Sequence, residues 1–60
     1  MYDVRQLLKR YGIFIYTGDR LNDLHMIKLE INELYALKVI SIKEYEKALL
    51  IIHREFRHFS

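Results

Sequence analysis

Apolar residues near the start of the chain recur with the spacing of a helix. Four of them occupy positions i, i+3, i+4 and i+7: Val4, Leu7, Leu8 and Tyr11. Asp3 followed by Gln6 has the form of a helix start, because an aspartate oxygen accepts an amide and the Gln side chain reaches back. Gly12 stands where a left-handed C-terminal cap is expected. We therefore predict a short helix over residues 4–11.

A second, longer set of apolar residues repeats with the same period. It gathers on one face: Leu24, Ile27, Ile31, Leu34 and Tyr35. Thr17 or Asp19 is the expected N-cap of a helix over residues 19–37. Its carboxylates form a flank roughly opposite that face: Asp19, Asp23, Glu30 and Glu33. Met26, Leu29 and Leu37 lie along this flank, too far from the core face to be buried by one neighbouring helix, which indicates a partner.

The start of a third helix is the strongest local signal in the chain. Ser41 and Glu44 have the spacing of a capping box, and Ile40 and Tyr45 have that of a hydrophobic staple. The helix is predicted over residues 42–58, with a core face made of Tyr45, Leu49, Ile52, Phe56 and Phe59. A short link between two long helices predicts an antiparallel hairpin.

Residues 13–16 are rich in β-formers but have no partner strand elsewhere in the sequence. We interpret them as an extended connector that buries alternate side chains, with Phe14 and Tyr11 expected in the core. The predicted fold is all-α: a small three-helix bundle of one short helix and a long antiparallel helical hairpin, forming a single domain over residues 1–60.

Composition agrees with one small folded domain. The 60 residues are 52% hydrophobic and 30% charged, with a net charge of +2. A domain of this size is marginally stable alone, and without Cys the expected stabilising device is a homo-oligomer. The longest apolar run, residues 48–52, is far shorter than the roughly 20 residues of a membrane span. We expect a cytoplasmic protein with no membrane contact.

Residues that carry catalytic chemistry lack the required context. There is no Cys nucleophile, Ser41 is accounted for as a cap, and Gly12 and Gly18 match neither the P-loop nor the dinucleotide pattern. His53 and His58 point away from each other, and the Asp19 and Asp23 carboxylates are interpreted as solvated charge. We predict no enzyme activity, no metal, no cofactor and no small-molecule substrate.

Basic residues form a stripe on the predicted third helix, opposite its core face. These are Lys43, Lys47, Arg54 and Arg57. Three cations of the first helix extend the patch if that helix packs alongside: Arg5, Lys9 and Arg10. Tyr16 is the best candidate for an aromatic ring on which a base stacks. The hypothesis is therefore a noncatalytic protein that binds the phosphates of single-stranded RNA or DNA through these basic residues.

Two alternatives stay open for the basic stripe. A row of Lys and Arg opposite a core face is also the ordinary solvated face of a helix. The separation of an acidic from a basic helix also suits a homo-oligomer or adaptor, with four apolar contact residues: Met26, Leu29, Leu37 and Leu50.

Several segments resemble the YqgQ-like family of small bacterial proteins. They are Y-D-V at residues 2–4, Q-L-L-K at 6–9, I-Y-T-G-D-R-L at 15–21, E-L-Y at 33–35 and K-E-Y at 43–45. The resemblance implies a compact three-helix bundle in a cytoplasmic protein without a catalytic motif, with single-stranded nucleic-acid binding as a proposed role. Residues 16–21 are its most specific part, and residues 16–20 are interpreted as a connector and cap.

Overall fold

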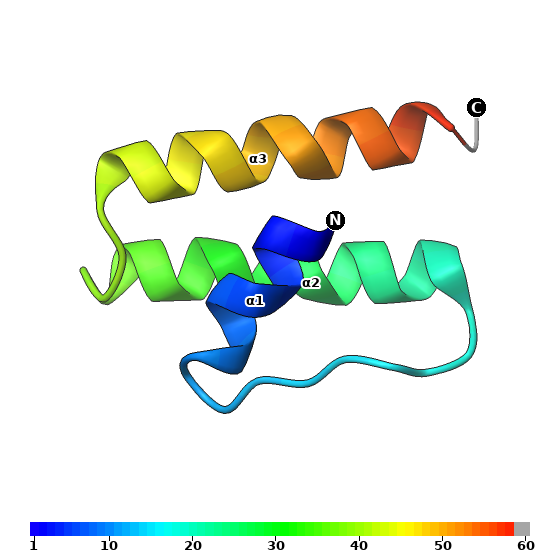
Figure 1. Ribbon diagram of the computed structural model, residues 1–60, viewed down its shortest axis with the longest axis horizontal. Helices are drawn as coiled ribbons and strands as arrows, with labels where there is room; N and C mark the ends of the chain where they lie inside the picture. Colours follow the sequence, from blue (N-terminus) through cyan, green and yellow to red (C-terminus); the bar gives the residue numbers. More distant parts are fainter. Residues whose placement is uncertain (59–60) are drawn as a thin grey trace.

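Three helices make up the computed structural model, which describes residues 1–58 (Figure 1). They are α1 (Tyr2–Lys9), α2 (Arg20–Ala36) and α3 (Ile42–Arg57). The helices α2 and α3 lie antiparallel, and α1 packs across this hairpin (Figure 1). Residues 1–58 contain no strand, so the predicted all-α bundle with a short first helix is confirmed. None of the three helices is long and apolar enough to cross a membrane.

Helix α1 begins earlier than predicted. Its N-cap is Met1, which makes no side-chain capping bond, so the prediction of a start at Asp3 is wrong. Asp3 has a helical backbone and lies in the first turn, where its carboxylate faces the positive end of the helix dipole. The predicted cap at Gly12 is confirmed. Its φ is +74°, and the N–H groups of Gly12 and Ile13 donate to the Lys9 and Leu8 carbonyls, both at 3.0 Å.

Helix α2 begins after one of the two predicted N-cap residues, Asp19, and is followed by a non-glycine residue with a left-handed backbone, Lys38. The Asp19 carboxylate accepts the N–H groups of Leu21 and Asn22 at 3.1 and 3.3 Å. At the other end, Lys38 has a φ of +59°, and its N–H donates to the Tyr35 carbonyl at 2.9 Å. This left-handed position usually holds glycine, because a Cβ crowds the backbone there.

Helix α3 carries the predicted capping box. The Glu44 N–H donates to the Ser41 hydroxyl and the Ser41 N–H donates to the Glu44 carboxylate, both at 3.1 Å. Ile40 is buried and Tyr45 packs partly buried against the core cluster, as the staple predicted. Because the link between α2 and α3 is fixed at both ends, the hairpin geometry follows from local sequence.

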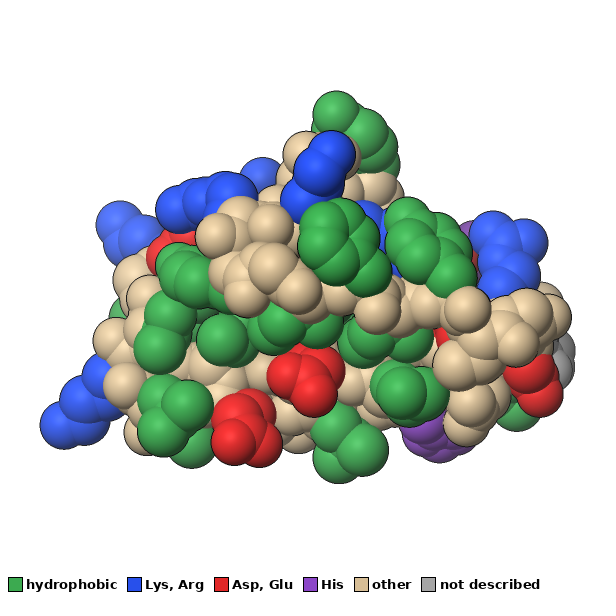
Figure 2. All heavy atoms as spheres, turned by 90° about the horizontal axis from the view of Figure 1, so that it is seen from below, with side chains coloured by type: hydrophobic (Ala, Val, Ile, Leu, Met, Phe, Trp, Pro, Cys, Tyr) green, Lys and Arg blue, Asp and Glu red, His purple; other side chains and the backbone are tan. Residues whose placement is uncertain are grey.

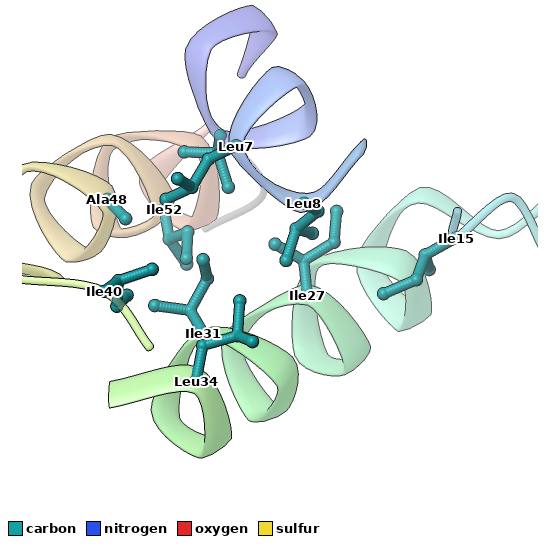
Figure 3. Close-up of a cluster of buried hydrophobic side chains, with 10 residues drawn as sticks. Leu7, Leu8, Ile15, Ile27, Ile31, Leu34, Ile40, Ala48 and Ile52 are labelled. Atoms are coloured by element: carbon teal, nitrogen blue, oxygen red, sulfur yellow. The ribbon is translucent and has the colours of Figure 1, made fainter. Parts of the chain in front are cut away.

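Ten side chains from all three helices, the connector and the α2–α3 link form the core (Figure 3). They are Val4, Leu7, Leu8, Ile15, Ile27, Ile31, Leu34, Ile40, Ala48 and Ile52. Figure 3 shows Leu7 and Leu8 of α1 lying toward Ile52 and Ile27 of the hairpin. The core therefore ties the short helix to both long ones.

The core differs from the expected faces at Tyr35, at Ala48 and at Leu49, which is only half-buried and is not part of the core cluster. Tyr35, expected in the core, is instead at the edge of the hairpin, where its ring stacks on Tyr45 with centroids 4.1 Å apart. Ala48 is buried where α1 packs on α3, and its small side chain permits the close approach of the helices. Ile52 is fully buried as predicted, and Phe59 lies outside the described residues.

Candidate nucleic-acid interface

The connector between α1 and α2 alternates between buried and exposed side chains, as predicted. Ile13 and Ile15 face the core, whereas Phe14 and Tyr16 are 64% and 73% exposed. The expectation that Phe14 lies in the core is therefore wrong, because the connector turns its even-numbered side chains outward. Tyr11 is also partly exposed, and its hydroxyl donates to the Val39 carbonyl at 3.4 Å.

The end of the connector is fastened to α2 by Asp23. One carboxylate oxygen of Asp23 accepts the backbone N–H of Thr17 at 2.9 Å and also the Thr17 hydroxyl. The carboxylate is buried, so the interpretation of Asp23 as solvated charge is wrong. The Thr17 hydroxyl, the main cause, and the Thr17 N–H hold the pKa of Asp23 below its usual value, and the nearby charge of Arg5 adds to this effect.

Arg5 of α1 holds the middle of the connector. Its Nη1 donates to the Ile15 carbonyl at 2.9 Å, and its Cζ lies 4.4 Å from the ring centroid of Tyr16. Such a cation–π contact stabilises by about 0.5–1 kcal/mol at an exposed site. Arg5 is half-buried, and its guanidinium contacts both the backbone and a side chain of the connector.

Four residues form what we call the connector face: Arg5, Lys9, Phe14 and Tyr16. They line one shallow groove of about 130 Å³ between α1 and the connector. Figure 2 views the molecule from the connector side, where hydrophobic side chains project next to Lys and Arg side chains; most Asp and Glu side chains lie lower in the view, and one lies beside the Lys and Arg side chains at the upper left. The connector face thus combines exposed aromatic rings with positive charge.

The predicted α3 stripe has different surroundings. All four of its members are exposed: Lys43, Lys47, Arg54 and Arg57. Lys47 and Arg10 line a groove of about 230 Å³ between α1 and α3, and Arg54 lines its continuation toward the start of α1. Three carboxylates line the same grooves: Asp3, Glu44 and Glu55. Arg10 Nη1 lies 3.7 Å from Glu44 Oε2, so part of this positive charge is already matched.

Six of the eight predicted site residues line grooves on the two sides of helix α1, and Lys43 and Arg57 are not among them. Arg5 and Lys9 share a groove with Tyr16, whereas Arg10 lies with Lys47 in the other groove. The predicted extension of the α3 patch by the first helix is therefore seen for Arg10, and Arg5 and Lys9 instead meet the aromatic connector.

Sequence reasoning missed Asp23 as a support of the connector face, and it favoured the core for Phe14 although Phe14 is also a candidate for stacking. Alternation along residues 13–16 is the signal that places Phe14 on the same side as Tyr16. For Asp23, the available signal is a Thr six residues earlier, at the end of a connector that must be fastened to the helix. Within residues 1–58, no three His, Cys, Asp or Glu residues come together as a metal site.

Comparisons with known proteins place this architecture in a family. The model of the YqgQ-like family matches residues 1–58. The Uncharacterized protein YqgQ of Bacillus subtilis (strain 168) is 35% identical over 54 residues, which cover 90% of this chain and 76% of that protein. No solved structure matches the chain significantly. The family match and the identity together show that the chain belongs to the YqgQ-like family.

Proposed function

We propose that this protein is a noncatalytic module of the cytoplasm that binds single-stranded nucleic acid. The observation that carries the proposal is the connector face, where exposed Tyr16 and Phe14 lie beside Arg5 and Lys9. Proteins hold single strands by combining positive charge for the phosphates with aromatic rings on which bases stack.

The connector face meets this requirement better than the α3 stripe. Aromatic and basic side chains share one groove there, whereas carboxylates line the grooves that contain Lys47 and Arg54. A carboxylate next to a phosphate path repels the ligand, which lowers the net gain from each cation.

Fluorescence anisotropy with a labelled single-stranded 12-mer at two salt concentrations tests the proposal. We expect binding that weakens as salt rises, because neutralised phosphates release counterions. Lys9→Glu is expected to weaken binding, and Lys47→Glu is the matched charge reversal on the α3 side of α1. A wild-type protein that binds neither RNA nor DNA at low salt would rule out the function. If Lys47→Glu alone weakens binding, the α3 stripe is the interface.

A homo-oligomer is the second candidate, and one observation favours it. Met26 and Leu29 are exposed on α2 and Leu37 directly follows its last residue; Leu29 and Leu37 are each about two-thirds exposed. Exposed apolar stripes of this kind suit association between chains. Analytical ultracentrifugation over a range of concentrations tests this candidate, with Leu29→Glu as the disrupting variant. A monomer at every concentration argues against it.

A further inference from the structure

The ring of Tyr16 offers two faces with different surroundings. The guanidinium of Arg5 lies over one face, 4.4 Å from the centroid, and the side chain as a whole remains 73% exposed. One face of the ring is therefore covered by a planar cation and the other is open to solvent.

The backbone on both sides of Tyr16 is held by hydrogen bonds. Arg5 donates to the carbonyl of Ile15, the residue before Tyr16, and Thr17, the residue after it, donates to Asp23. Ile15 itself is buried in the core. The backbone that carries Tyr16 is thus held by contacts with α1, the core and α2.

We infer that one base of a single-stranded nucleic acid stacks on the open face of Tyr16, with Arg5 as the positioning residue behind the ring. This inference rests on the proposed function and names its binding mode. Stacking uses the face of the base and not its edge, so the ligand class is any single strand with an unpaired base, regardless of sequence. Phe14, two residues away on the same side of the connector, is within reach of the neighbouring base.

The mode predicts a shallow salt dependence. Lys9 and the remaining N–H groups of Arg5 are the cations of the connector face, so at most two phosphates are neutralised there. For single strands, the slope of log K against log salt is about −0.7 per phosphate, or about −0.7 to −1.4 here, against about −2 to −3 for three or four contacts on the α3 stripe.

A comparison of two ligands isolates the stacked base. A labelled deoxythymidine 12-mer and a 12-mer of the same length made of abasic residues carry the same phosphates but differ in bases. We expect the wild-type protein to prefer the base-containing strand by at least about fivefold. Equal affinity for both strands would overturn the stacking inference while leaving the proposed function intact. Binding of neither strand would instead be a failure of the proposed function.

Three variants assign the preference to Tyr16. Tyr16→Leu is expected to lose the preference, and Tyr16→Phe is expected to keep it because the ring remains. Tyr2→Leu is the matched control, since Tyr2 is equally exposed, at 74%, but lines the groove between α1 and α3. A Tyr16→Leu protein that is folded by circular dichroism and still prefers the base-containing strand would overturn the assignment.

Arg5→Lys separates positioning from charge. Lys keeps the positive charge but lacks the planar group that covers the ring and donates to the Ile15 carbonyl. We expect affinity for the abasic strand to change by less than about twofold, because the charge count is unchanged. The preference for bases should fall. An unchanged preference would show that Arg5 does not position the ring.

Discussion

Asp23 of α2 accepts two hydrogen bonds from Thr17 of the connector, one from its backbone N–H and one from its hydroxyl. Both bonds favour the charged carboxylate, so its pKa in the folded protein lies below the usual 3.8. A carboxyl group with a lowered pKa in the folded state stabilises the fold above its unfolded pKa. That contribution is lost as the pH falls through the folded value.

We therefore expect Asp23→Asn to melt at a lower temperature than the wild type at neutral pH, with the difference shrinking below pH 3.8. Thermal unfolding followed by circular dichroism at a series of pH values measures this difference. Thr17→Val removes the hydroxyl donor and should raise the pKa of Asp23 toward 3.8, which carboxyl NMR can follow. A melting difference that stays constant as the carboxylate titrates would contradict the assigned role of its charge.

Lys38→Gly is expected to stabilise the protein. Lys38 has a φ of +59°, and a left-handed backbone costs a residue with a Cβ about 1–2 kcal/mol, whereas glycine adopts it freely. After the larger chain entropy of glycine in the unfolded state is subtracted, we expect a gain of about 0.5–1 kcal/mol in urea unfolding. Lys38→Ala keeps the Cβ and should give no gain. Equal stabilisation by both variants would point to the loss of charge as the cause.

Ser41→Ala is expected to destabilise the hairpin through the start of α3. It removes the oxygen that accepts the Glu44 N–H, and loss of such a cap typically costs about 1 kcal/mol. Ser41→Asp retains an acceptor at the same position and serves as the control. The free energies of unfolding are measured in urea, and an Ala variant as stable as the wild type would mean that water replaces the cap without loss.

Ile52→Val tests the packing of the core where α1 meets the hairpin. Ile52 has no exposed surface, and removing one buried methylene typically costs about 0.5–1.5 kcal/mol. Ile42→Val makes the same change at a half-exposed position of the same helix, where we expect an effect within about 0.5 kcal/mol. Similar losses at both positions would indicate an effect of helix propensity instead of packing.

The sequence predicts those parts of the fold that depend on neighbouring residues. The capping box of Ser41 and Glu44 and the glycine cap at residue 12 are satisfied within a few positions, so their patterns are sufficient. The buried face of α2 is also predicted, since Ile27 and Ile31 follow the helical period. The start of α1 is not predicted, because Asp3 is compatible with both a cap and a first turn.

The connector face depends on contacts that no local pattern encodes. From its residue type alone, Arg5 is a candidate for binding phosphate. The path of the connector, however, brings the Ile15 carbonyl and the Tyr16 ring to it. Asp23 has the period of an exposed flank, but Thr17 covers it. In both cases the partner lies across the connector, whose route is set by the burial of Ile15 in the core.

The two attachments of the connector have a consequence for conformational entropy. Residues 13–16 lie between the glycine cap of α1 and the bond from Thr17 to Asp23. Ordering a backbone costs about 1–2 kcal/mol per residue, so these four residues lose about 4–8 kcal/mol of chain freedom when the protein folds. A ligand that meets Phe14 and Tyr16 encounters backbone that is already ordered, and its affinity is not reduced by that cost.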